Sequence, residues 1–271
     1  MRILSITEQP IVEIPFLNAG KGPGAFYTDR LPIHTGEVSQ LPDGLDALLV
    51  TADLQGRERF QEANGGPPRL LGEALPERLC SDLLPELNLI PCRMGVILAG
   101  DFYTVPNLDK RGGSGDVLPV WQAFAKRFRW AVGVAGNHDT FGDRDEPTRN
   151  VANNAQYLDC SSANLDGLEI AGIGGIIGYP NKLHRKTEED YLTHAELLLE
   201  QRPDVLVMHD GPDSPKRRLR GSSNIRQTIE RFPKTLVVRG HSHWTIPLVE
   251  LANGTQVLNV DCRVVILHRS E

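Results

Sequence analysis

The sequence predicts an α/β fold in which buried strands alternate with helices. Five short runs, each rich in Val, Leu and Ile, have the length and nearly continuous apolar character of strands buried on both faces. Helical spacing between several runs and a strand-like alternation near the C-terminus are the other two observations behind this prediction. The five runs lie at residues 45–52, 95–99, 130–134, 204–208 and 235–238.

Three connecting segments carry apolar residues at helical spacing, at residues 117–128, 187–199 and 225–232. Thr187 is expected to open the second helix, with Asp190 as a capping carboxylate three residues later. Ser222 or Ser223 is expected to begin the third helix. Helices would then precede three of the apolar runs.

The C-terminal part predicts antiparallel strands. Residues 246–251 and 256–260 alternate in polarity around the turn Asn253-Gly254, and residues 262–268 form a final strand. Residues 1–44 precede the first run as an N-terminal accessory segment, in which residues 3–14 can supply one or two strands. Residues 57–94 form an insertion with a helix expected at 72–84. Either segment could act as a cap over a site, although we favour surface decoration.

Polar residues follow every one of the five apolar runs. Because ligands bind outside the carboxyl ends of strands in α/β sheets, these side chains are expected to meet. Asn, His and Asp crowded at strand ends indicate a metal centre rather than a packed core. The residues are Asp53 and Gln55, Asp101, then Asn137, His138 and Asp139, then His209, and finally His241 and His243.

In this order the motifs resemble those of calcineurin-like metallophosphoesterases. That family carries Asp-x-His, Gly-Asp, Gly-Asn-His-Asp/Glu, a lone His after a strand, and Gly-His-x-His. Here Gly-Asn-His-Asp spans residues 136–139 and Gly-His-Ser-His spans residues 240–243. The resemblance implies one metallophosphoesterase domain over residues 1–271, folded as a four-layer sandwich of two mixed β-sheets flanked by helices.

The resemblance also implies two divalent metal ions that hold a phosphate ester between them. Asp101 is expected to bridge the two ions. Asp53, Gln55 and His243 would complete the shell of the first ion, and Asn137, His209 and His241 would complete the shell of the second.

The remaining roles follow from the same resemblance. A hydroxide that bridges the metals would attack phosphorus. His138 would protonate the leaving oxygen, and Asp139 would hold the His138 imidazole in the productive tautomer.

Gln55 departs from the family pattern, which has His at this position. A neutral amide oxygen should weaken the first metal and favour harder ions, so we expect Mn²⁺, with Fe, Zn²⁺, Ni²⁺ and Mg²⁺ left open. The chain also lacks the Gly-Asp-x-x-Asp-Arg signature of protein phosphatases. A small phosphate ester, with a phosphodiester preferred and a nucleotide as one candidate, is therefore the expected substrate. A phosphomonoesterase, a nuclease and a catalytically inactive interaction module are the alternatives.

Basic residues near the motifs are candidates for binding the substrate. Arg217 and Arg218 belong to the charged run 216–220, and Arg144 and Arg149 follow the third motif. A run of this kind is more often a solvated loop, which is the favoured interpretation.

The composition is that of a globular enzyme. The chain has 271 residues, of which 40% are hydrophobic, and its net charge of −6 argues against nonspecific binding to duplex nucleic acid. The four cysteines are scattered, which favours reduced thiols. The start of the chain has too short an apolar stretch for a signal peptide, and no stretch is long enough to span a membrane. A cytoplasmic location is expected, whereas the oligomeric state is left open.

Overall fold

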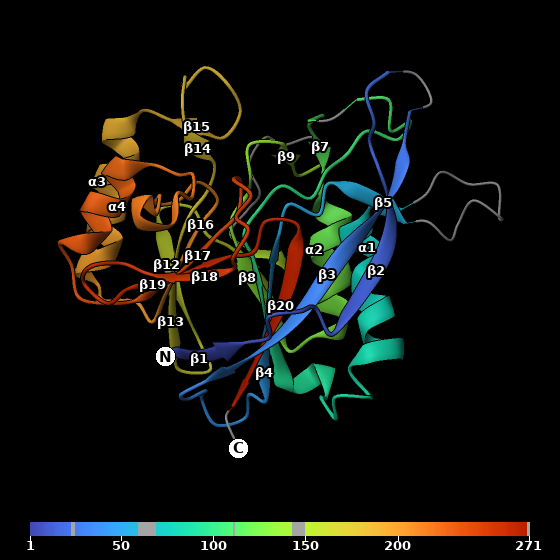
Figure 1. Cartoon of the computed structure of the whole chain (residues 1–271), viewed down its shortest axis with the longest axis horizontal. Coiled ribbons are helices and arrows are strands. Elements are labelled where there is room, and N and C mark those ends of the chain that lie inside the picture. The colour runs from blue at the N-terminus through green and yellow to red at the C-terminus, as the bar shows by residue number, and fades with distance from the viewer. Residues whose placement is uncertain (23–24, 59–68, 111, 143–149, 270–271) are drawn as a thin grey trace.

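The computed structural model describes residues 1–22, 25–58, 69–110, 112–142 and 150–269. Two β-sheets lie face to face, and helices cover the outer face of each sheet (Figure 1). The helices α1 (Leu71–Arg78) and α2 (Leu118–Arg127) pack on the larger sheet, and α3 (Glu188–Glu200) and α4 (Ser223–Glu230) pack on the smaller one. The expected four-layer α/β sandwich is confirmed.

The larger sheet has its parallel strands at the centre. Strand β4 (Ala47–Ala52) pairs in parallel with β6 (Met94–Leu98), which pairs in parallel with β8 (Trp130–Gly133). On the other side of β4, β20 (Arg263–Arg269) runs antiparallel. Beyond β8, the sheet continues with β11 (Ala155–Tyr157) and ends with β10 (Asn150–Ala152). Beyond β20, it continues with β3 (Tyr27–Val38), β2 (Val12–Asn18) and β5 (Gly56–Glu58), and β1 (Ile3–Ile6) also pairs with β3.

The smaller sheet contains a parallel core of β13 (Leu168–Ile173), β16 (Val205–Met208), β17 (Leu236–Arg239) and β19 (Gln256–Asn259). Its antiparallel edges are β12 (Ser161–Leu165) and β18 (Leu248–Glu250), so the predicted C-terminal hairpin is present as β18–β19. Two short ladders lie outside both sheets: β7 (Gly115–Asp116) with β9 (Asp139–Thr140), and β14 (Ile176–Ile177) with β15 (Arg185–Lys186).

Apolar side chains on both faces of the central strands explain the layers. In β4, Leu49 joins the core beneath α1 and α2, whereas Leu48 and Val50 join the core between the two sheets. In β16, Leu206 and Met208 belong to a third core beneath α3 and α4. Strands that bury both faces are therefore continuous apolar runs, as the sequence indicated.

The helix starts follow the predicted caps. Thr187 Oγ1 accepts a hydrogen bond of 3.1 Å from the backbone N–H of Asp190 at the start of α3. Ser222 Oγ accepts one of 3.2 Å from the backbone N–H of Ile225 at the start of α4. Each side chain pairs one of the N–H groups that a helix start leaves without a partner.

The two segments expected as additions are built into the layers. Residues 1–44 supply β1, β2 and β3, which extend the larger sheet. In the insertion, α1 continues into a π-helical segment, Leu79–Leu83, and the buried Leu71, Leu75 and Leu79 join the core with α2. The described part of the insertion is thus a structural layer rather than a cap or a surface decoration; residues 59–68 lie outside the described residues. Over the described chain, no helix is long and apolar enough to cross a membrane.

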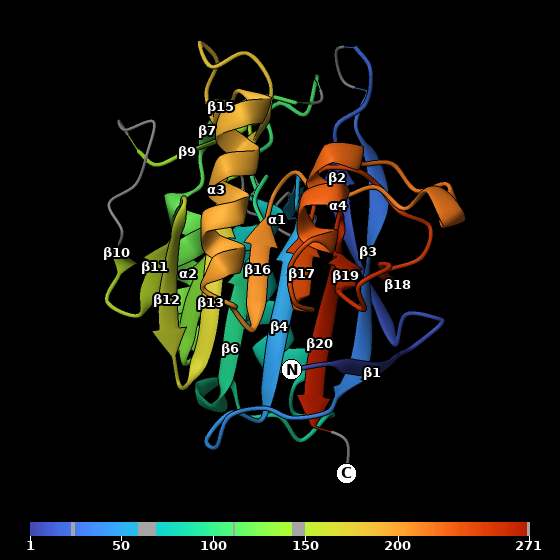
Figure 2. The same cartoon turned by 90° about the vertical axis from the view of Figure 1, so that its left-hand side faces the viewer.

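The strand directions bring the motif loops together. Strands β4, β6 and β8 are parallel, and β20, which leads to the C-terminus, runs opposite to them. In Figure 2 the C-terminus lies at one end of the molecule, and β7, β9 and β15 lie at the other. The carboxyl ends of the central strands therefore point away from the C-terminus, toward the end that carries the motif loops.

Candidate metal centre

A cavity of about 320 Å³ lies at the carboxyl ends of the central strands. Its floor contains Asp53, Gln55, Asp101, His138 and His241, which the sequence analysis selected from four separate motifs. The other lining residues come from the end of β2, from the loop after β6 and from the segment after β19: Phe16, Asn18 and Ala19; Thr104 and Gly112; Asp261 and Cys262.

Three of the predicted ligands share an uncommon backbone conformation. Asp53, Asp101 and His241 have φ values of 55°, 60° and 65°, in the left-handed region. A non-glycine residue there costs of the order of 1–3 kcal/mol, so the surrounding structure must hold it. Part of that support is a backbone hydrogen bond of 2.8 Å from Asp53 N–H to the carbonyl of Gly100. The conformation turns the chain sharply at each strand end.

Two motif glycines leave space for these carboxylates. A Cβ atom at Gly136 would lie 2.0 Å from Oδ1 of Asp101, and one at Gly240 would lie 2.3 Å from Oδ2 of Asp53. Neither contact is sterically allowed. The glycines of Gly-Asn-His-Asp and Gly-His-Ser-His are therefore required by close packing against the carboxylates of other motifs.

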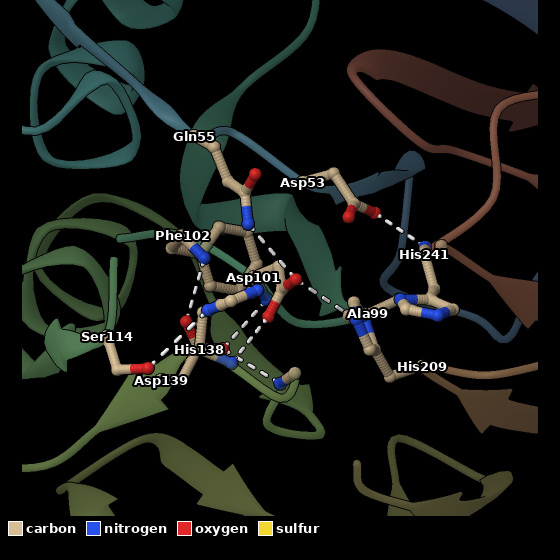
Figure 3. A network of polar contacts seen from close by, with 12 residues as sticks. Asp53, Gln55, Ala99, Asp101, Phe102, Ser114, His138, Asp139, His209 and His241 are labelled. Atoms are coloured by element: carbon tan, nitrogen blue, oxygen red, sulfur yellow. Dashed lines mark hydrogen bonds and ion pairs between the residues drawn. The ribbon is translucent and has the colours of Figure 1, made fainter. Parts of the chain in front are cut away.

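Asp101, His209 and His241 form a compact set of donor groups. One donor atom from each lies within 4.8 Å of the others (Figure 3). His209 is fully buried, and its Nδ1 contacts the carbonyl of Ala99 at 2.7 Å, which leaves Nε2 directed toward Oδ2 of Asp101 at 3.3 Å. A backbone carbonyl on the far nitrogen is the usual way in which a metal-binding imidazole is oriented.

Charge within this set is strongly coupled. Burial opposes the charged form of Asp101, but the positive charge and hydrogen bonding of His209 outweigh it and lower the pKa of Asp101 to about 2. Burial likewise opposes protonation of His209, yet the Asp101 carboxylate raises its pKa to about 10. The proton of the charged His209 ring lies between Nε2 and the carboxylate of Asp101. A metal cation at this place would neutralise the same carboxylate.

Two buried atoms support a cation at this position. Asn137 Oδ1 is shielded from solvent and has no hydrogen-bond partner among the described residues, and the equally shielded His209 Nε2 has the carboxylate of Asp101 at 3.3 Å as an ion-pair partner. Orphaned buried polar atoms are rare and need an explanation such as an ion. Asp101, His209 and His241 therefore fit a divalent cation, with oxygen and nitrogen donors that suit transition metals, and the unpaired Oδ1 of Asn137 is the candidate for a further donor.

The side of the site assigned to the first metal is more open. Asp53 Oδ2 accepts a hydrogen bond of 2.9 Å from the backbone N–H of His241. Gln55 Nε2 donates one of 3.1 Å to Oδ2 of Asp101, and a half-turn of the amide would place Oε1 there instead. Burial raises the pKa of Asp53 well above its ordinary value, and the neighbouring carboxylates Asp261 and Asp101 add to this while His209 opposes it. Three carboxylates, those of Asp53, Asp101 and Asp261, therefore line this part of the cavity.

His243 lies at the edge of this region. Its side chain is 67% exposed and does not line the cavity, and its Nδ1 contacts Oδ2 of Asp261 at 2.9 Å. The structure therefore brings His241, but not His243, into the compact donor set.

His138 is placed as expected for a group that meets the substrate. Its side chain lines the cavity, and its backbone N–H donates to Oδ1 of Asp101 at 2.9 Å. Nδ1 lies 3.4 Å from Oγ of Ser114, a residue that the sequence analysis did not select. The ring is thus held beside the donor set without belonging to it (Figure 3).

The expected role of Asp139 does not match its contacts and is corrected here. Its fully buried carboxylate accepts three backbone hydrogen bonds of 2.8 Å, from the N–H groups of Asp101, Phe102 and Gly136. Burial and the nearby charge of Asp101 raise the pKa of Asp139 to about 6, although the backbone donors oppose this. Asp139 joins the second and third motif loops; it does not orient the His138 imidazole.

The arginines proposed for substrate binding are not brought to the cavity. Arg217 and Arg218 are exposed on the loop after β16, and neither lines the cavity, which supports the solvated-loop alternative. The loop folds as a short 3₁₀ turn, Pro215–Arg217, that directs the basic side chains outward. Arg144 and Arg149 lie outside the described residues.

Sequence reasoning also missed two parts of the cavity. Asp261 follows the apolar strand β19, which is the same signal that selected the other ligands, but it belongs to no motif of the family. Phe16, Asn18 and Ala19 form a wall from the N-terminal segment, and only the pairing of β2 with β5 brings them there.

A comparison with protein families identifies the family of the chain. A family model described as calcineurin-like phosphoesterase matches residues 47–245. The solved structures that match include a phosphopantetheinyl hydrolase from Mycobacterium tuberculosis (12% identity, 80% of this chain and 90% of that chain, TM-score 0.45). Others are a protein of unknown function from Aquifex aeolicus (16% identity, 81% and 95%, TM-score 0.36) and the sulfate thiohydrolase SoxB from Thermus thermophilus (13% identity, 82% and 53%, TM-score 0.41).

No curated protein matches the chain. The family model, however, covers well over half of it and includes the five motifs from Asp53 to His243. The chain belongs to the calcineurin-like phosphoesterase family and is a metal-dependent phosphoester hydrolase.

Proposed function

We propose that this protein is a phosphodiesterase that uses two divalent metal ions, with Mn²⁺ preferred, to hydrolyse small phosphate diesters such as nucleotide derivatives. The observation that supports it best is the compact donor set of Asp101, His209 and His241, together with the buried Oδ1 of Asn137, which has no hydrogen-bond partner among the described residues. His138 lies on the wall of the same cavity.

The ligand residues are proposed to divide into two shells that share Asp101. When bound, the metal pair would supply an activated water and neutralise charge on the phosphate. Asn137, His209 and His241 would hold the second ion, and Asp53, Gln55 and His243 would hold the first. Asp101 is suited to the shared position because its two oxygens face different groups: Oδ1 faces the backbone of His138, and Oδ2 faces both His209 and Gln55.

His138 is proposed to act on the substrate. As an imidazolium, it can stabilise negative charge on the phosphorane and give its proton to the leaving oxygen. Ser114 Oγ lies 3.4 Å from Nδ1 and can help to orient the ring. An acid of this kind matters most for alkoxide leaving groups, which depart poorly without a proton, and this supports the preference for diesters.

Replacing His138 tests this role directly. His138→Asn should lower kcat by about 10²- to 10⁴-fold, because general acid catalysis contributes that much. The loss should be larger for an alkyl phosphodiester than for a p-nitrophenyl ester, whose leaving group needs little protonation. Steady-state kinetics on both substrates measure the difference, and calorimetry should show unchanged metal affinity. An equal loss on both substrates would argue against the acid role.

The substrate class is tested by turnover of bis-p-nitrophenyl phosphate against p-nitrophenyl phosphate, with Mn²⁺, Ni²⁺, Zn²⁺ and Mg²⁺ supplied in turn. The proposal expects a higher kcat/KM for the diester, and Mn²⁺ as the best activator. Faster turnover of the monoester would identify a phosphomonoesterase. A folded protein that hydrolyses no ester with any of these metals would be an interaction module.

A further inference from the structure

The contact between Asp261 and His243 is not explained by the family motifs. The side chain of His243 is 67% exposed, and the hydrogen bond of 2.9 Å from its Nδ1 to Oδ2 of Asp261 is its one side-chain hydrogen bond to described residues. Asp261 is much better shielded, with 14% of its side chain exposed. The exposed imidazole is thus tied to a carboxylate that is itself held in place.

The backbone fixes Asp261 beside the first metal site. It forms a parallel bridge with Ala52, the residue directly before Asp53, and the N–H of Cys262 donates to the carbonyl of Ala52 at 3.2 Å. Asp261 also lines the cavity together with Asp53 and Gln55. Its position is therefore set by the strands that position Asp53. Asn259, which accepts a hydrogen bond of 3.3 Å from the N–H of Asp261, also donates one of 2.8 Å to the carbonyl of Ser242 and so links the same segment to the loop that carries His243.

A carboxylate on the far nitrogen of a metal-binding imidazole has two effects. It keeps the proton on Nδ1, so that Nε2 carries the lone pair, and it makes Nε2 a stronger donor. Both effects matter more at an exposed histidine, whose ring is otherwise free to rotate. Fixing the tautomer and strengthening Nε2 as a donor are also more important in the first metal site, because Gln55 supplies a neutral amide there where the family has an imidazole.

We propose that Asp261 is a positioning residue of the first metal site, which holds His243 through Nδ1 and keeps Nε2 available to the cation. The inference rests on the proposed two-metal function. It assigns to Asp261 a role that compensates for the weak ligand Gln55, and it predicts that His243 and Asp261 act as one unit.

Titration of the metal-free full-length protein with Mn²⁺ by calorimetry, without substrate, tests the proposal. The wild type should bind two ions with different affinities. Asp261→Asn should weaken the lower-affinity ion by about 10- to 100-fold, the usual effect of losing a group that orients a metal ligand, and should leave the tighter ion unchanged. Asp213→Asn is a matched control, because Asp213 is comparably shielded and pairs with Arg226 away from the cavity.

The variants His243→Ala and His243→Ala/Asp261→Asn complete a double-mutant cycle. If Asp261 acts through His243, Asp261→Asn should cause no further loss once the imidazole is gone. Nitrogen-15 NMR of the histidines gives a readout that a general structural defect would not produce. His243 should be the Nδ1–H tautomer in the wild type and a mixture of tautomers in Asp261→Asn.

Two results would overturn the proposal: unchanged affinity for the lower-affinity ion in Asp261→Asn, or an equal loss in the His243→Ala background. The second would show that Asp261 acts on the ion without His243. If instead the wild type binds fewer than two ions, the two-metal function fails and the role of Asp261 fails with it. Two ions in the wild type with no effect of Asp261→Asn would refute the inference alone.

Discussion

The two halves of the metal centre differ in how much of each is assembled before any ion binds. In one half, the side chains of Asn137 and His209 are buried and follow the central strands of the two sheets, and His241 is the exposed member of that half. Around Gln55 and His243, the groups are partly or largely open to solvent. Preorganised donors lose less conformational entropy on binding, so the buried half should hold its ion more tightly.

Replacing Asp101 should give the largest effect, because this residue faces both halves. Asp101→Asn removes the shared negative charge, and hydrolysis should fall by about 10³-fold or more, since metal ions provide several kcal/mol of transition-state stabilisation. Assays on bis-p-nitrophenyl phosphate, with Asp213→Asn as control, measure this loss. Retained turnover in Asp101→Asn would break the two-metal interpretation altogether.

The buried half is tested by Asn137→Ala. Removing an orphaned buried donor should weaken the tighter Mn²⁺ ion by at least about tenfold, because even groups that only support a ligand contribute that much. Calorimetric titration should show the lower-affinity ion almost unchanged. If the weaker ion is the one lost, the two halves have been assigned in the wrong order.

The open half is tested by Gln55→His, which restores the usual ligand of the family. An imidazole is a better donor than an amide for Zn²⁺ and Mn²⁺, so affinity at the lower-affinity site should rise by about tenfold and the preference should shift toward Zn²⁺. Competition between the two metals, followed by calorimetry, measures the shift. Equal affinity in both forms would place Gln55 outside the coordination shell.

Proton release on metal binding should also distinguish the two halves of the centre, and it is the smallest of the effects expected here. Asp101 raises the pKa of His209 to about 10, so at pH 7.5 the ring of the metal-free protein is protonated. The tighter ion must displace that proton, and its affinity should therefore rise with pH until the pH approaches 10. Calorimetry in buffers of different ionisation enthalpy should detect about one proton released. Binding without proton release would contradict the His209–Asp101 ion pair.

Local sequence signals predicted the elements well, because their causes are local. The Thr187 and Ser222 caps satisfy N–H groups within their own first turns, and a turn at Asn253-Gly254 joins β18 to β19. The long apolar runs became central strands, since only buried strands tolerate apolar residues on both faces. The motif order was sufficient to indicate which side chains would meet at one cavity.

Predictions that depended on the direction of a side chain were less successful. Asp139 follows His138 in sequence, yet its carboxylate turns to the backbone of Asp101 and Phe102 in another loop and of Gly136 in its own, since buried N–H groups there need an acceptor. Arg217 and Arg218 are close to His209 in sequence, but their loop exposes them to solvent, where a charged group avoids the cost of desolvation. The N-terminal wall was missed because pairing between strands distant in sequence leaves no local signal.

The order of residue types along the chain determined the family, the layered fold and the set of groups able to bind metal, because these depend on periodicity and on donor chemistry. Tertiary structure alone decided that Asn137 and His209 are buried, that His243 is exposed, and that Asp261 lies beside it. Burial and hydrogen bonding arise from contacts between strands more than 100 residues apart, such as the contact of His209 with Ala99. Those contacts divide one set of ligands into a preassembled half and an open half.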